Sequence, residues 1–347
     1  MDDARILGKM VRGRMAHRPL FLSHLVTARC NGHCAHCLWR FAGPDDARAV
    51  ETELTTEEIL WLYRRSAEAG MSHLALWGGE PLLRKDIVDI CSAASNAGLS
   101  VTLMTNGWLL PDLWPRLRGH VRTLMLSLDD VGEEFDRTRG LPGLFERLDG
   151  FARGLRDDPL RPRLLVNLVL SRLNGGALRR VAPVAQRWRA GLYFCPMDVG
   201  EMQSEGFVAR HEQLELSEDE LREAARLAGL LKAEGYPLQA TNKYLSLLER
   251  DPRLRDWSCR FPQLALTVLP DGSFRDCRRR DIPLGNVREL YEAGASLEAL
   301  FRLPRYQEMV HEAPQCSTCN NPDKLETSWG WQLRPSMMWR SLTLSWR

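Results

Sequence analysis

The stretch that decides the fold is Cys30-Asn31-Gly32-His33-Cys34-Ala35-His36-Cys37, which places three cysteines within eight residues. It directly follows a mostly apolar run at 21–26, which predicts a buried strand. Three thiolates can hold three irons of an iron–sulfur cubane and leave the fourth iron open to a small chelating molecule. Zinc, with His33 or His36 as its fourth ligand, is the alternative. Structural zinc sites, however, favour two short pairs separated by a longer gap.

Three further segments follow the cysteine loop in a fixed order. Residues 74–83 contain Gly78-Gly79-Glu80, residues 101–107 end in Thr105-Asn106-Gly107, and residues 123–130 contain Ser127 and Asp129. With the Cys-x3-Cys-x2-Cys loop, this series resembles the radical S-adenosylmethionine (SAM) enzymes over roughly residues 20–200. The series departs from the family pattern at one point, because an aromatic residue usually precedes the third cysteine and this chain has His36 there.

The resemblance implies two cofactors at this loop. Cys30, Cys34 and Cys37 would bind a [4Fe–4S] cluster, and SAM would chelate its open iron and yield a 5′-deoxyadenosyl radical that takes a hydrogen atom from the substrate. The resemblance offers these residues for SAM contacts: His36, Gly78, Gly79, Glu80, Thr105, Asn106, Ser127, Asp129 and Asn167. Ser127 and Asp129 fit ordinary capping of strand ends equally well.

Strand-like and helix-like segments alternate through the first 200 residues. The apolar runs lie at 21–27, 73–78, 100–105, 123–128, 164–170 and 192–197, and the helical patterns lie at 55–69, 85–98, 110–119, 143–155 and 176–190. Such alternation predicts an α/β fold with a parallel sheet and right-handed crossovers. Six units fit the partial (β/α)6 TIM-like barrel of the resembled family, over residues 1–210. Active sites of such barrels lie at the carboxyl ends of the strands, where all the motifs fall.

A small α+β domain is expected after a polar helical connection at 211–250. It would span 251–325, with a hairpin at 264–277 around Pro270-Asp271-Gly272 and a helix at 297–311. Four cysteines accompany it: Cys259, Cys277, Cys316 and Cys319. Composition alone favours zinc, but the layout resembles the Twitch extension of radical SAM enzymes, which implies one auxiliary [4Fe–4S] cluster. The larger SPASM version has seven cysteines, more than this segment offers.

Two cysteines stand outside both groups. Cys91 fits the apolar face of the helix at 85–98 and is expected in the core. Cys195 lies in the sixth strand, where its thiol is a candidate hydrogen donor to a substrate radical. The alternative is a buried, small apolar residue, the commonest fate of a free cysteine.

The expected function is a radical SAM oxidoreductase or epimerase that dehydrogenates or epimerises a small polyol, sugar or aminoglycoside. An electron-accepting auxiliary cluster favours oxidation, and about 20 residues before the first strand leave no room for a domain that binds a peptide leader. One alternative is a radical SAM maturase of a ribosomal peptide. Another is a non-catalytic electron-transfer or zinc-stabilised binding protein. The expected partners are the substrate and an external one-electron donor such as flavodoxin or ferredoxin.

Composition excludes several other classes. The 347 residues carry 47 basic and 45 acidic side chains, a net charge of +2, so nothing indicates nucleic-acid binding. No run approaches the roughly 20 apolar residues of a membrane span, and no signal peptide is visible, which favours a cytoplasmic protein. A tail at 326–347 carries Trp329, Trp331, Trp339 and Trp346; packing against the protein is favoured over contact with a membrane.

Overall fold

The computed structural model describes most of the chain. The described residues are 18–39, 42–197, 212–255, 257–275, 283–315, 319 and 321–331, with the backbone alone at 212, 330 and 331. Most of the Trp-rich tail therefore lies outside the described residues. None of the described helices has the length and hydropathy that crossing a bilayer requires.

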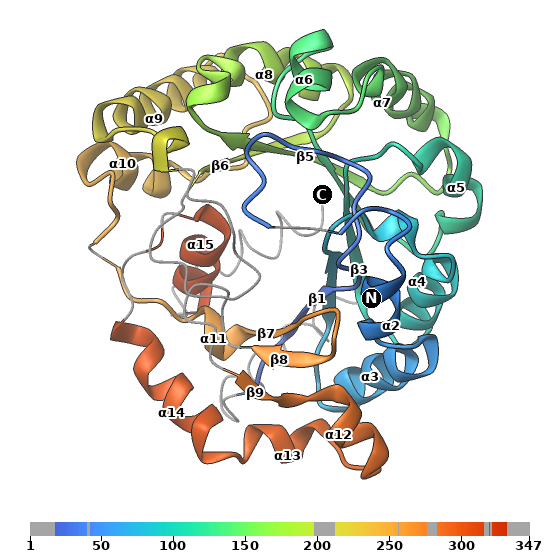
Figure 1. Cartoon of the computed structure of the whole chain (residues 1–347). Helices are drawn as coiled ribbons and strands as arrows, with labels where there is room; N and C mark the ends of the chain where they lie inside the picture. Colours follow the sequence, from blue (N-terminus) through green and yellow to red (C-terminus); the bar gives the residue numbers. More distant parts are fainter. Residues whose placement is uncertain are drawn as a thin grey trace.

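The described strands form one curved sheet in the order β6-β5-β4-β3-β2-β1-β7-β8-β9. Their bounds are β1 Phe21–Leu25, β2 His73–Trp77, β3 Ser100–Thr105, β4 Thr123–Ser127, β5 Arg163–Leu170, β6 Gly191–Pro196, β7 Ala265–Val268, β8 Ser273–Arg275 and β9 Pro283–Asn286. β1 to β6 pair in parallel in chain order, and β7 pairs in parallel with the free side of β1. β8 and β9 then add antiparallel strands. The expected partial barrel is confirmed, and β6 and β9 are its two edges (Figure 1).

Helices cover the outer face of this sheet (Figure 1). Their bounds are α2 Ala47–Thr52, α3 Thr56–Glu68, α4 Ile87–Asn96, α5 Leu110–Leu117, α6 Gly132–Arg139, α7 Leu144–Gly154, α8 Ala177–Arg187, α9 Glu218–Ala233, α10 Asn242–Arg250, α11 Phe261–Leu264, α12 Val287–Glu292, α13 Leu297–Phe301, α14 Pro304–Glu312 and α15 Pro322–Trp331. α15 differs from the others, since it stands within the arc of the sheet and contacts α10 and α11 (Figure 1).

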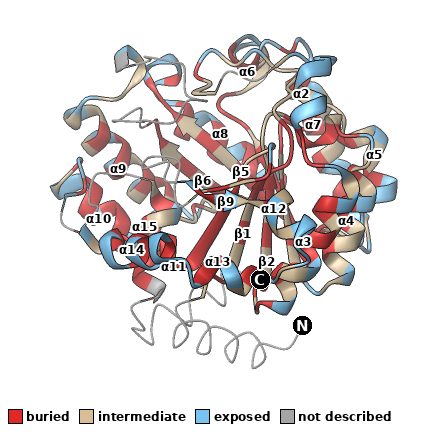
Figure 2. Ribbon diagram, turned by 60° about the horizontal axis from the view of Figure 1, so that its bottom comes forward, coloured by how far each residue is buried: buried red, intermediate tan, exposed pale blue. Residues whose placement is uncertain are grey.

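The core lies between the sheet and its outer helices. In β3, Val101 and Leu103 are buried while Thr102 and Met104 are half-buried, so alternate side chains face the helices and the interior of the barrel. The same alternation holds in β2 and β6. Figure 2 shows the buried residues following the strands and the inner faces of the surrounding helices. Cys91 of α4 is fully buried in this core, as expected.

The structure differs from the sequence expectations in one expected helix and in several elements that had not been expected. The single helix expected at 297–311 was wrong: α13 and α14 are separate, because Leu303 is extended before Pro304, and a proline disfavours helical backbone at the preceding residue. The elements that had not been expected are α2, α6, α11, α12, α15 and β9. The hairpin at 264–277 forms as β7 and β8, and the connection at 211–250 contains α9 and α10.

Candidate active site

The cysteine loop leaves the carboxyl end of β1 and closes on itself. The amide of Cys30 donates to the carbonyl of Ala42 at 2.9 Å, and the amide of Ala42 donates to the carbonyl of Ala28 at 2.8 Å. Within the loop, the amide of Cys37 donates to the carbonyl of Cys34 at 3.0 Å. These bonds make the loop a compact turn at the edge of the sheet where the motifs meet.

The end of α6 holds the loop from the other side. The amide of His33 donates to the carbonyl of Arg139 and the amide of Ala35 to that of Thr138, both at 2.9 Å. The Arg139 guanidinium also lies 3.6 Å from the sulfur of Cys34. A helix that sequence analysis had not expected therefore brings a buried cation to a candidate cluster ligand.

The three thiols are half-buried and lie near one another. Burial raises the pKa of Cys30 to about 12, and the nearby Glu80, Cys34 and Cys37 add to this rise. Burial likewise raises the pKa of Cys37, with a contribution from Cys34. No three metal-ligating side chains among the described residues converge on one ion, but a cubane takes one thiolate per iron and does not need that. The donor set fits a [4Fe–4S] cluster better than zinc.

The Gly78-Gly79-Glu80 edge packs against residues 27–29, which form the stem that leads into the cysteine loop. The amide of Gly79 donates to the carbonyl of Thr27 at 3.0 Å, and the amide of Glu80 donates to that of Arg29 at 2.8 Å. A Cβ on Gly78 would lie 2.6 Å from the Thr27 carbonyl oxygen, and one on Gly79 would overlap the Arg29 carbonyl. Gly78 also has a φ of 146°, which disfavours any side chain. The glycines therefore allow two backbones to approach closely.

Glu80 joins the ends of β2 and β3. Its fully buried carboxylate accepts from the Thr105 hydroxyl at 2.6 Å, the Asn106 amide at 2.8 Å and the Leu82 amide at 3.0 Å. Burial raises the pKa of Glu80, and these donors oppose the rise. The Asn106 side chain reaches on to the Asn31 carbonyl oxygen at 2.8 Å. Sequence analysis had selected Glu80, Thr105 and Asn106, and the structure brings them together beside the loop.

Asp129 and Arg139 form a buried ion pair behind the loop. The Arg139 guanidinium lies 2.5 Å from the Asp129 carboxylate, which also lies 3.5 Å from the His36 ring and accepts from the Val169 amide at 2.9 Å. Burial opposes the charge of Arg139, but Asp129 and Cys34 raise its pKa, so it stays protonated. The Arg139 Nε has no hydrogen-bond partner within the described residues. A buried donor of this kind fits an anionic ligand.

Ser127, Asn167 and Cys195 lie on three neighbouring strands. Ser127 and Asn167 are register partners on β4 and β5, and both are half-buried. Cys195 alternates with the buried Phe194 on β6, so its thiol faces the interior of the barrel. There the side chain of Asn321, the residue just before α15, lies 3.4 Å from the Cys195 sulfur. Cys195 is therefore half-buried beside α15 rather than packed in the outer core.

The C-terminal cysteines are only partly described. Two of the four expected ligands lie outside the described residues: Cys277 and Cys316. Cys259 and Cys319 are both buried, and the Ser258 hydroxyl donates to the Pro314 carbonyl at 2.9 Å, which ties together the two segments that carry them. Burial raises the pKa of Tyr244, with contributions from Cys195 and Cys319. Cys195 and Cys319 thus lie in one neighbourhood around α10 and α15.

This chain is similar in sequence to a known family and to known proteins. The family model of the Radical SAM superfamily matches residues 25–169. The AdoMet-dependent heme synthase of Methanosarcina barkeri is 39% identical over 136 residues, which is 38% of this chain and 38% of that enzyme. The PqqA peptide cyclase of Rhizobium meliloti is 28% identical over 286 residues, 78% of this chain and 72% of the cyclase. The match to the heme synthase thus spans little more than a third of either protein.

Solved structures of SuiB from Streptococcus suis share the fold. The structure with bound S-adenosylmethionine has a TM-score of 0.63 at 15% identity and covers 84% of this chain and 68% of SuiB. The structure with the precursor peptide SuiA has a TM-score of 0.64 at 14% identity and covers 87% and 70%. The cysteine loop at the end of β1 and the glycine edge at the end of β2 both lie within residues 25–169, the part of this chain that matches the Radical SAM superfamily.

Proposed function

We propose that this chain is a radical SAM maturase that modifies a peptide. The radical SAM part rests on one observation: three half-buried thiols on a closed loop, beside a cation and a glycine edge. The peptide part rests on the PqqA peptide cyclases, which match 78% and 90% of this chain. SuiB, which has the same fold, is known with a precursor peptide bound.

This proposal reverses the order of the sequence expectations. A small polyol, sugar or aminoglycoside as substrate, and with it an oxidoreductase or epimerase of such a molecule, has weaker support because the relatives that cover most of the chain act on a peptide. The non-catalytic alternative is less consistent with a loop whose thiols suit a cubane and whose neighbouring Arg139 Nε has no partner among the described residues.

Different residues around the loop would bind the two cofactors. Cys30, Cys34 and Cys37 would hold the [4Fe–4S] cluster, and Arg139, with its unpartnered Nε, would bind the carboxylate of SAM. Glu80 is buried, which disfavours its negative charge, and the positive ammonium group of bound SAM would stabilise that charge. When bound, these cofactors supply a one-electron cleavage of SAM and removal of a hydrogen atom from the substrate.

The interior of the barrel would receive the substrate. Ser127 and Asn167 would contact SAM from β4 and β5, as would the buried His36 and Asp129 at the base of the loop. Cys195 faces the same interior from β6 and would donate a hydrogen atom if the product requires one. Burial of the surrounding groups would keep water from the reacting atoms.

The C-terminal part would supply a second redox centre. We assign residues 1–210 to the barrel, 211–250 to the helical connection, 251–325 to a Twitch-like domain and 326–347 to the tail. Four cysteines in it would bind an auxiliary [4Fe–4S] cluster: Cys259, Cys277, Cys316 and Cys319. An internal acceptor for a second electron suits a net oxidation, with flavodoxin or ferredoxin in the cytoplasm as donor of the first.

Anaerobic reconstitution tests the radical SAM assignment. The intact chain should bind about eight irons and should form 5′-deoxyadenosine from SAM with dithionite. The variant C30A/C34A/C37A should bind about four irons and form none. Equal iron in the two proteins, or 5′-deoxyadenosine from the triple variant, would overturn the assignment.

The substrate class needs a separate comparison. Cells of the source organism that produce the intact chain are compared with cells that produce C30A/C34A/C37A, by mass spectrometry of the peptide and the sugar fractions. A peptide that is lighter by the mass of two hydrogens only with the intact chain supports a peptide maturase. A change confined to the sugar fraction would return the small polyol or sugar to first place.

A further inference from the structure

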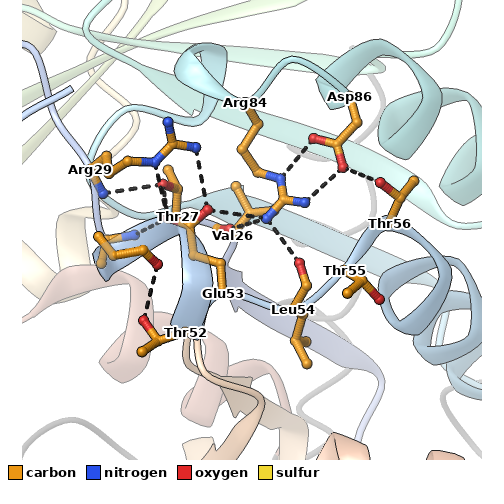
Figure 3. Close-up of polar contacts among 12 residues, drawn as sticks. Val26, Thr27, Arg29, Thr52, Glu53, Leu54, Thr55, Thr56, Arg84 and Asp86 are labelled. Carbon is orange, nitrogen blue, oxygen red and sulfur yellow. Dashed lines mark hydrogen bonds and ion pairs between the residues drawn. The ribbon is translucent and has the colours of Figure 1, made fainter. Parts of the chain in front are cut away.

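A buried carboxylate holds the stem that leads into Cys30. Glu53, at the end of α2, accepts from the Thr27 hydroxyl, from the Ala28 amide at 3.1 Å and from the Arg29 guanidinium at 3.3 Å (Figure 3). Its side chain is only 3% exposed. Three consecutive residues before the first cluster cysteine therefore contact one carboxylate, which comes from an element outside the loop.

A second buried cation connects Glu53 to the strands. Arg84, just after the Gly78-Gly79-Glu80 edge, donates to the carboxylate of Glu53 at 3.4 Å and to the carbonyls of Val26 and Leu54 at 3.2 Å (Figure 3). It also makes a two-bonded ion pair with Asp86 at 2.9 and 2.7 Å. The end of β1, the segment before α3 and the segment before α4 thus share one guanidinium.

The stem is held on two sides by different groups. The carbonyls of Thr27 and Arg29 accept from the amides of Gly79 and Glu80. The Thr27 hydroxyl, the Ala28 amide and the Arg29 guanidinium instead donate to Glu53. The glycine edge alone leaves those donors unsatisfied in a buried setting. Burying an ionic group costs free energy unless all of its hydrogen-bond partners are in place. Such a network therefore favours one arrangement of the stem rather than adding to the stability of the fold.

We propose that Glu53 is a positioning residue for the cluster loop. It sets the stem at 27–29, and thereby Cys30, against the Gly78-Gly79-Glu80 edge at the distance that the bound cluster and SAM require. The proposal rests on the proposed radical SAM function, because it presumes that the loop binds the cluster. Glu53 acts through the stem and does not itself contact the cluster cysteines.

The test compares Glu53→Gln with a matched buried carboxylate elsewhere. Asp149 is 8% exposed, accepts from Trp188 and Arg187 at 2.7 Å each, and lies on α7 away from the loop. Intact chain, E53Q and D149N are reconstituted anaerobically. The release of iron to a chelator is then measured in each protein. Each measurement is repeated in a version of the same protein that also carries C30A/C34A/C37A, and the difference between the two gives the iron held by the loop. The electron paramagnetic resonance spectrum of the reduced protein is recorded with and without SAM.

Glu53→Gln should release loop iron roughly tenfold faster than the intact chain, and SAM should change its spectrum less. The remaining iron should leave at the rate of the intact chain, and D149N should change neither rate selectively even where it lowers the unfolding temperature. Equal loop-iron release and an equal SAM effect in E53Q and the intact chain would overturn the proposal. Thr27→Val, which removes one bond to Glu53, carries the same test should E53Q fail to fold.

The failure of the proposal differs from failure of the proposed function. An intact chain without loop iron would remove the radical SAM assignment itself. An intact chain that holds loop iron while E53Q holds it equally well would remove only the role of Glu53.

Discussion

Gly79 has no room for a side chain. An added Cβ would overlap the Arg29 carbonyl, which accepts from the Glu80 amide. Because the two backbones lie so close together, any side chain at residue 79 would push either the stem or the end of β2 out of place. The stem leads into Cys30, so any movement there reaches the cysteine loop.

Gly79→Ala is therefore expected to impair the cluster loop. We expect a loss of about 1–3 kcal/mol in the free energy of unfolding from overpacking, together with less iron at the loop after reconstitution. Urea unfolding and iron analysis measure these two effects. Gly150→Ala is the control, because nothing lies within 4 Å of a Cβ at that position of α7. Retention of full loop iron in G79A would contradict this view of the edge.

Arg139→Lys tests the buried cation beside Cys34. Lysine keeps the charge but loses the fork that reaches Asp129 and Cys34 together. We expect SAM to bind at least roughly tenfold more weakly, as measured by titration of the reconstituted protein. Arg137→Lys, on the exposed side of the same helix, should bind SAM as the intact chain does. Unchanged SAM affinity in R139K would exclude Arg139 from the SAM site.

The sequence alone could select candidate ligands but not the groups that surround them. Cysteine spacing selected Cys30, Cys34 and Cys37, and local motifs selected Glu80 and Asn106. Arg139 lies 105 residues from Cys34, and no spacing rule connects them. Sequence analysis missed Glu53 and Asn31 for the same reason. Each is a single polar residue, one after a short helix and one within a loop, and its partners are known only once the chain has folded.

At the scale of elements, β1 and α3 are joined by a buried polar pair. His24 of β1 and Tyr63 of α3 are both fully buried, and the His24 Nδ1 lies 2.9 Å from the Tyr63 hydroxyl. Burial, assisted by Arg84, lowers the pKa of His24 from its ordinary value of 6.5 to about 3. Between pH 6.5 and about pH 3, His24 therefore binds a proton in the unfolded chain but not in the folded chain.

This pair predicts a loss of stability in acid. The stabilising effect of a neutral His24 is complete above pH 6.5 and falls as the pH drops from 6.5 toward about 3. His24→Leu should reduce this acid dependence, at a cost of about 1–3 kcal/mol at neutral pH for the Tyr63 hydroxyl. Urea unfolding at pH 7.5 and pH 5 measures both. His311→Asn, at an exposed position, should keep the dependence of the intact chain; the same slope in H24L would refute the prediction.

Two of the elements that sequence analysis missed, α6 and β9, share a physical cause. α6 begins with Gly132 and is mostly charged, so it shows little apolar periodicity. β9 reads Pro283-Leu-Gly-Asn286, and only one of its four residues is buried. Both elements form because tertiary partners hold them. The six apolar runs, by contrast, are buried strands on their own pattern, and all six were predicted.

At the scale of the molecule, Arg288 connects α12 to a segment more than 200 residues earlier in the chain. From α12 it donates to the carbonyls of Thr52 and Glu53 at 3.1 and 2.8 Å and to the Glu58 carboxylate at 3.1 Å. Trp61 of α3 packs edge-on against Tyr291 of α12 nearby, with ring centres 5.8 Å apart. α12, which follows the β8–β9 pair, therefore contacts the backbone of Glu53.

Arg288→Ala should loosen this connection. We expect a loss of about 1 kcal/mol in the free energy of unfolding, because the side chain is partly exposed and water replaces some of its bonds. Amide exchange should rise in α12 and at the start of α3 and stay constant in α7. Arg302→Ala, whose side chain is 79% exposed, is the control and should alter neither. Exchange that rises evenly across the molecule would argue against a local connection.

The order of the sheet has a consequence for synthesis on the ribosome. β1 is made first, yet its second neighbour, β7 at Ala265–Val268, is translated some 240 residues later. Until then an unpaired strand edge beside the cysteine loop is open to pairing with other nascent chains. Translation that pauses before β7 should therefore increase aggregation, and chains halted there should depend most on chaperones.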